Sequence, residues 1–182
     1  MVEKLKAEYN VDLEWRPFYL YFDTPPEGRE LPEHVKRARA NGSEERLRQM
    51  AESYGMEFIS TQRIYNTRLA HEATAYARLH GKGNEFHKVV FRKVYVDGQD
   101  PSQWEVLRAA AEAVGLDADE MQREVESEKY QATVVDEVRW AYEIGVTGVP
   151  TYVINNRYAI VGAQAYEVFK GALEQIAKQA PD

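Results

Sequence analysis

The chain contains no cysteine and four histidines, and these facts limit the chemistry that its side chains can perform. Without cysteine, the 182 residues hold no disulfide, no zinc–thiolate site and no thiol nucleophile. His34, His71, His80 and His87 lack the spacing of a zinc site, since the two nearest in sequence fall on different predicted helices. The glycine-centred acidic pattern of a calcium loop is also missing. We therefore expect no metal ligand, no cofactor and no thiol catalysis.

A short turn near the end of the chain is the second feature with chemical meaning. Residues 145–150 read Gly-Val-Thr-Gly-Val-Pro and lead directly into Thr151-Tyr152-Val153-Ile154, whose β-branched and aromatic residues predict a strand. Asn155-Asn156 predicts a two-residue hairpin turn, because asparagine tolerates positive φ, and residues 158–161 return as the partner strand. The apolar spacing over 164–179 predicts a final amphipathic helix.

Bulk composition narrows the classes of partner. Twenty-three basic against thirty acidic residues give a net charge of −7. Nucleic acids and anionic membranes both require a basic face, so neither is expected as a partner. No apolar run approaches the roughly 18–20 residues of a membrane span, and the N-terminal residues lack the apolar core of a signal peptide. These features predict a cytoplasmic protein.

The front of the chain predicts a helix followed by a strand. Val2, Leu5 and Tyr9 share one helical face. From residue 11 to residue 16 apolar and charged residues alternate, which is the period of a half-buried strand. Pro17 cannot donate to a ladder, so we expect this strand, at 11–19, to lie at an edge or to end there.

The middle of the chain predicts a loop and then a helical block. Proline, glycine and asparagine turn signals indicate a loop over 21–42, with Lys36, Arg37 and Arg39 on a solvated face. A helix with Leu47, Met50 and Tyr54 in its apolar stripe should follow Ser43 and stop at Gly55. Further helices are predicted over residues 68–80, 85–96, 117–128 and 130–144, with another beginning near Ser102.

Strands at both ends with helices between them indicate an α/β class, in which a core sheet carries a helical insertion. We predict a discontinuous core domain from residues 1–23 and 130–182, and an inserted helical domain from residues 24–129.

Motifs spread over nearly the whole chain identify a family. They are Leu13-Glu14-Trp15-Arg16-Pro17-Phe18, Pro25-Pro26-Glu27-Gly28, Asn66-Thr67 with His71, Gly115-Leu116-Asp117, the turn at 145–150, and Val161-Gly162-Ala163-Gln164. In this order they resemble the DsbA family, thioredoxin-like proteins with an inserted helical domain. The resemblance is strongest to the branch of FrnE-like proteins, 2-hydroxychromene-2-carboxylate isomerases and kappa-class glutathione transferases.

The chain departs from this family at its front. FrnE-like relatives begin with a strand, a Cys-Pro-x-Cys turn and a helix, whereas this chain starts inside that helix. The resemblance thus implies a thioredoxin-like fold with an inserted helical domain, the first core strand missing, and no residue that inherits catalysis. We expect a member of a thiol-disulfide oxidoreductase family that is redox-inactive as this chain and acts by binding or assembly. A thiol-free isomerase or glutathione-dependent enzyme of the same branch, and an N-terminally truncated oxidoreductase, are the alternatives.

The resemblance also implies where a ligand would bind. It makes the Val149-Pro150 bond cis and assigns to Val149 and Pro150 the backbone contacts with an extended peptide or a small thiol-type ligand such as glutathione. His71 lies where the family has a histidine near this groove, and Gln164 lies at its corner. Glutathione-using relatives have Ser-Asp where this chain has Ala163-Gln164, which favours the FrnE-like branch.

The missing strand has a consequence for assembly. In the family it lies between the strands predicted here at 11–19 and 151–154, so its loss leaves a gap of about 9–10 Å, two strand spacings. Unpaired strand edges favour association with another chain. We therefore expect a homodimer formed at these edges. Direct pairing of the two flanking strands across the gap, and a natural protein that starts upstream of this chain, are the alternatives.

Overall fold

The structure, a computed structural model, describes residues 2–179 and divides into two compact units. One unit comprises the residues up to Glu14 and those from Arg139 onward, and the other runs from Trp15 to Val138. We call them the terminal unit and the helical unit. The predicted division was into 1–23 with 130–182 and 24–129, whereas the observed one falls at Glu14 and Arg139. Trp15 and Tyr19 join the helical unit, where their rings contact His87 and His71.

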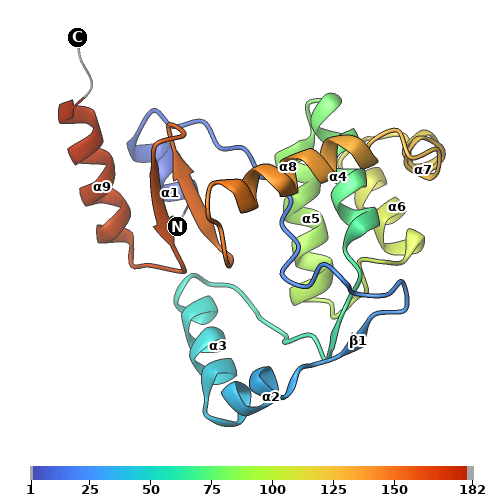
Figure 1. Cartoon of the computed structure of the whole chain (residues 1–182), viewed down its shortest axis with the longest axis horizontal. Helices are drawn as coiled ribbons and strands as arrows, with labels where there is room; N and C mark the ends of the chain where they lie inside the picture. The colour runs from blue at the N-terminus through green and yellow to red at the C-terminus, as the bar shows by residue number, and fades with distance from the viewer. Residues whose placement is uncertain (1, 180–182) are drawn as a thin grey trace. The chain divides into compact units, whose positions relative to one another are not determined.

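The terminal unit is built on a β-hairpin (Figure 1). Strands β3 (Thr151–Ile154) and β4 (Tyr158–Val161) are antiparallel and pair from Thr151 with Val161 to Ile154 with Tyr158. Asn155 and Asn156 take the predicted positive φ, at 52° and 53°. The loop between the paired strands nevertheless holds residues 155–157, one more than predicted, because pairing begins at Tyr158.

The last helix of the terminal unit packs on this hairpin and also contacts the first helix. In α9 (Tyr166–Gln179), the buried Phe169 meets the Tyr152 ring edge-on at 4.7 Å between centroids. Helix α1 (Val2–Glu8) places the ammonium of Lys4 3.9 Å from the centre of the Tyr166 ring. The predicted opening and closing helices are therefore both present. Helix α8 (Gln131–Glu143) contributes its last residues to this unit.

The helical unit has its core around α4 (Arg68–Leu79), which contacts α5 (Gly83–Tyr95), α6 (Trp104–Ala113) and α7 (Ala118–Glu126). Small residues on α4 allow these neighbours to approach closely. Tyr76, Phe86, Leu107 and Met121 are the large side chains that fill the centre. The predicted helical block is thus correct in its main elements.

Helix ends in this block follow the predicted capping only in part. The Asp117 side chain accepts a hydrogen bond from the N–H of Glu120 at 2.8 Å, which is the expected cap of α7. The cap of α6 is Gln103, one residue after the expected Ser102, and its side chain makes no capping bond.

The structure corrects two predictions near the front. Residues 11–16 alternate between half-buried and exposed, as their sequence indicates, but form no strand because none of the described residues pairs with them. The predicted loop at 21–42 contains β1 (Arg29–Glu30) and α2 (Glu33–Ala40). Strand β1 pairs with β2 (Arg63–Ile64), and helix α2 packs beside α3 (Ser43–Ser53).

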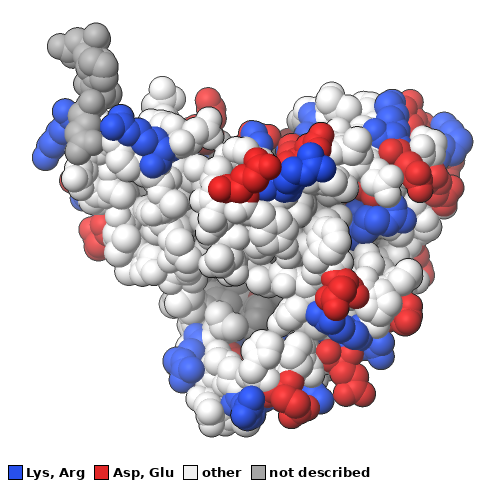
Figure 2. All heavy atoms as spheres, in the orientation of Figure 1, with Lys and Arg blue, Asp and Glu red and all other residues white. Residues whose placement is uncertain are grey.

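Charges of both signs mingle on the visible face of the helical unit (Figure 2). Ion pairs explain this mixing: Arg108 lies 2.6 Å from Asp119, and Lys129 lies 2.6 Å from Glu124. None of the helices within residues 2–179 combines the length and apolar character needed to cross a membrane.

Candidate functional site

The turn that carries Val149 and Pro150 begins where α8 ends. Gly145, with φ of 83°, donates to the carbonyl of Tyr142 at 3.0 Å, and Val146 donates to the carbonyl of Ala141 at 2.9 Å. These two bonds form a Schellman motif, which stops the helix and satisfies its last carbonyls. Glycine is needed here because a side chain would disfavour this φ. The helix end therefore fixes where the loop starts.

The far end of the loop is fixed by the hairpin. The Thr151 hydroxyl donates to the carbonyl of Gly148 at 2.7 Å, and the N–H of Gly162 donates to the carbonyl of Pro150 at 2.8 Å. The Val149–Pro150 peptide bond is cis. Val149 itself is 52% exposed, and among residues 2–179 no hydrogen bond engages its N–H or C=O. The loop thus presents one residue with unused backbone groups on an anchored frame.

Gln164 lies at the corner next to this loop, close to the Gly162 that bonds Pro150. Its side-chain amide donates to the carbonyl of Val161 at 2.8 Å, and its own N–H donates to the carbonyl of Gly162 at 3.0 Å. The residue is exposed. These bonds use Gln164 to shape the turn between β4 and α9, so a contact with a ligand would need its amide to turn away from Val161.

His71, the remaining predicted site residue, belongs to the helical unit. It is half-buried on α4, where its ring meets the Tyr19 ring edge-on at 5.3 Å between centroids. Burial lowers the pKa of His71 from 6.5 to about 4, and a hydrogen bond with the Phe18 backbone opposes this only in part. The imidazole is therefore neutral at pH 7 and holds the segment around Phe18 against α4.

A second histidine, which sequence reasoning treated as an ordinary one, lies close to His71. His87 on α5 stacks on Trp15 with the ring centres 4.0 Å apart and the planes at 16°. Burial, together with a smaller effect of the nearby His71, lowers the pKa of His87 to about 4. The pairing of residues 15 and 87 leaves no signal in local sequence spacing, so only a tertiary structure reveals it.

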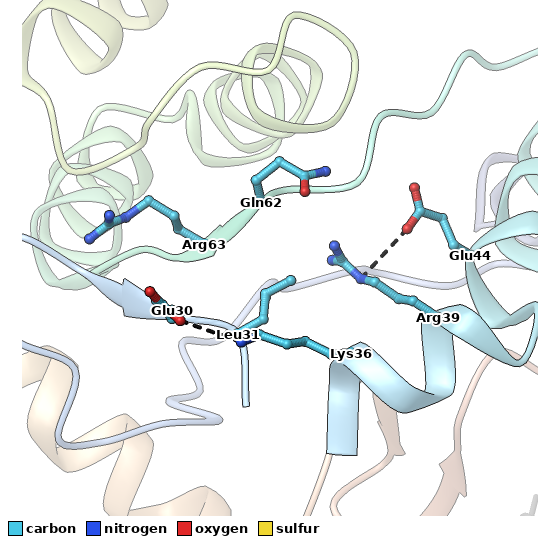
Figure 3. Close-up of a pocket in the computed structure, with 7 residues that line it drawn as sticks. All are labelled: Glu30, Leu31, Lys36, Arg39, Glu44, Gln62 and Arg63. Carbon is cyan, nitrogen blue, oxygen red and sulfur yellow. Dashed lines mark hydrogen bonds and ion pairs between the residues drawn. The ribbon is translucent and has the colours of Figure 1, made fainter. Parts of the chain in front are cut away.

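A polar recess of about 480 Å³ lies elsewhere in the helical unit, between β1, β2, α2 and α3 (Figure 3). Its lining includes Lys36 and Arg39, which the sequence placed on a solvated loop or helix face. Lys36 and Arg39 are three residues apart, and residues at this spacing lie on the same side of a helix. A helix predicted over this segment would therefore have placed the two side chains together.

The family model for the DSBA-like thioredoxin domain matches residues 1–174. The chain belongs to the DSBA-like thioredoxin domain family. An uncharacterized protein of Bacillus subtilis, YwbO, is 30% identical over 180 residues, which cover 97% of this chain and 88% of that protein. Membership of the DsbA-like family, expected from the motifs, is confirmed.

Two solved structures are similar to the chain. The crystal structure of a probable DsbA oxidoreductase from Streptomyces coelicolor is 26% identical, with a TM-score of 0.74 over 80% of this chain. The chain spans 63% of that protein's length. The structure of a 2-hydroxychromene-2-carboxylate isomerase has a TM-score of 0.79 and covers 98% of this chain and 87% of that protein, at 19% identity. These likenesses support a DsbA-like thioredoxin fold that is rich in helices.

The chain therefore combines this family's fold with a sequence that has no cysteine. Thiol–disulfide exchange requires a thiolate to attack a sulfur, and no residue of this chain supplies one. Among residues 2–179, no group of three or more histidine, aspartate and glutamate side chains is placed to hold a metal ion. Among the described residues of the predicted site, Val149 offers backbone N–H and C=O groups that no hydrogen bond engages.

Proposed function

We propose that this chain is a DsbA-like binding protein that holds an extended peptide, or a small thiol-type ligand, through the backbone at Val149. One observation carries the proposal. Val149 is exposed, its N–H and C=O are unused within residues 2–179, and hydrogen bonds at Gly148 and Pro150 anchor both sides of it. Unused backbone groups at a fixed position are the requirement for adding a strand-like ligand.

The mode of binding follows from these groups. A ligand backbone in extended conformation donates to the C=O of Val149 and accepts from its N–H, as in strand addition. Main-chain bonds give affinity with little selection for sequence, so the 52% exposed Val149 side chain would offer an additional apolar contact. A bound thiol or disulfide remains chemically unchanged, because the chain contains no cysteine.

The proposal is tested by removing the Val149 N–H. Val149→Pro deletes this donor, while Val149→Ala keeps it and shortens only the side chain. Binding of a fluorescent extended peptide without cysteine should weaken by roughly tenfold or more in Val149→Pro and by less than about threefold in Val149→Ala. Circular dichroism confirms that both variants remain folded. Equal affinities of the two variants, or no binding to the wild type, would contradict the proposal.

We also propose a homodimer that forms at the edge of β3. Within residues 2–179, β3 pairs only with β4, and this supports an edge that accepts a further strand. Sedimentation at micromolar concentration should give a dimer. Substituting Val153 by proline, which removes a ladder donor, should shift the population toward monomer. A monomer in the wild type at these concentrations would rule the dimer out.

A further inference from the structure

The polar recess in the helical unit has a guanidinium that is held in place but weakly neutralised. The Arg39 side chain is 22% exposed, and its Nη2 donates to the carbonyl of Thr61 at 2.9 Å. This bond fixes the guanidinium, which Figure 3 shows among the side chains that line the recess. Its counter-ion, Glu44, is 43% exposed and lies 3.7 Å from Nε, beyond hydrogen-bond distance. Arg39 therefore keeps donors that Glu44 does not satisfy.

The rest of the lining favours a single negative charge. Lys36 and Arg63 add positive charge, and Arg63 is positioned by a hydrogen bond to the carbonyl of Glu27 at 3.1 Å. Glu30 and Glu44 line the recess, and the Lys36 ammonium also lies 3.0 Å from Glu33 on its own helix. Three cations therefore face three carboxylates, so a ligand monoanion that takes the place of Glu44 at Arg39 keeps the charges balanced. A dianion would add a charge that no cation of the recess matches.

An apolar contact lies in the same recess. Leu31, the residue directly after β1, lines it and has 8% of its surface exposed. The side chain of Gln62 also lines the recess, and Figure 3 shows it on the strand side, facing the region of Arg39. The volume of about 480 Å³ lies within the range of small-molecule sites.

We propose that this recess binds a small aliphatic monocarboxylate. The planar guanidinium of Arg39 can bind a carboxylate through two parallel hydrogen bonds. Its ion pair with Glu44, at 3.7 Å, does not form these bonds. The ligand carboxylate displaces Glu44 from Arg39, and the aliphatic chain rests on Leu31. Displacing an exposed glutamate costs little, because exposed pairs are weak. The site is independent of the Val149 loop, since it uses residues of the helical unit alone.

The proposal predicts opposite effects for the two partners of one ion pair. Glu44→Gln removes the competing carboxylate, so the affinity for butyrate should rise about two- to fivefold. Arg39→Gln removes the anchor, so the affinity should fall about tenfold or more. Arg48→Gln is the matched control, because Arg48 is 54% exposed on α3, pairs with Glu45 and does not line the recess. It should leave the affinity unchanged.

Chemical-shift titrations of the full chain with butyrate, butyramide and inorganic phosphate measure these affinities. Saturable millimolar binding of butyrate, with shifts at Leu31 and Gln62 and none from butyramide, is the expected result. If Arg39→Gln fails to fold, the Glu44→Gln titration still decides, since only displacement of Glu44 makes that variant bind more tightly. No saturable binding to the wild type, tighter binding of phosphate than butyrate, or weaker binding in Glu44→Gln would overturn the proposal.

Discussion

Acidification should destabilise the helical unit through His71 and His87. In the folded chain, burial lowers the pKa of each imidazole from 6.5 to about 4, and His71 contributes to the lowering at His87. Between these values the unfolded chain binds protons that the folded chain does not. The stability contribution is therefore complete above about pH 6.5 and is lost as the pH falls toward 4.

The magnitude is large enough to measure. A pKa difference between 6.5 and about 4 corresponds to about 3.4 kcal/mol for one histidine. Both rings are half-buried and retain some contact with solvent, which reduces this to about 2–3 kcal/mol each. Against a total stability of about 5–15 kcal/mol, the pair can remove a substantial fraction of the folding free energy by about pH 4.

Urea denaturation followed by circular dichroism, at several values between about pH 7 and pH 4.5, measures the effect. His87→Phe keeps an aromatic ring stacked on Trp15 but binds no proton, so its stability should fall less steeply with acid than that of the wild type. His34→Gln is the control, since His34 is exposed on α2. If His87→Phe and the wild type lose stability in parallel over this range, the proton linkage assigned to His87 is wrong.

Three further substitutions test the helical unit, two at glycines and one at a buried glutamate. Gly28→Ala should destabilise it by about 2–4 kcal/mol, because φ is +73° and the new Cβ would lie 2.6 Å from the backbone oxygen of Ile64. Gly55→Ala has a similar φ of +69° but no atom within 4 Å, so urea unfolding should show a loss of only about 1 kcal/mol, and equal losses would refute the clash. Glu72, fully buried and bonded to Arg68 at 2.9 Å, has a pKa raised by burial despite this partner. Its charge is therefore destabilising, so the stability of Glu72→Gln relative to the wild type should rise as the pH increases above 4.5, and a pH-independent difference would argue against it.

Local patterns in the sequence predicted most of the elements, because these depend on neighbours along the chain. The hairpin at 151–161 and the final helix were predicted from strand-forming residues, turn residues and apolar period. The N-cap at Asp117 followed from side-chain chemistry over three residues. The pattern at 11–16 indicated the correct alternation of burial, but a strand also needs a partner, and the sequence of one segment does not contain that information.

Tertiary context decided the rest. The apolar residues of α3 recur at helical spacing, which predicts a buried face. Leu47, Met50 and Tyr54 are nevertheless 48%, 45% and 49% exposed. The stacking of Trp15 on His87 and the placement of Arg39 in a recess both join residues far apart in sequence. The Val149–Pro150 loop was found from the sequence because its glycines, its proline and the following strand are contiguous.

Hydrogen exchange at the N–H of Val149 tests the proposed function most directly. In the free chain this N–H lacks a hydrogen-bond partner within residues 2–179 and should exchange rapidly. Saturation with an extended peptide that contains no cysteine should slow its exchange about tenfold or more, because the ligand accepts a hydrogen bond from it. Peptide binding that leaves the exchange of Val149 unchanged would show that the ligand is held elsewhere and would contradict the proposed function.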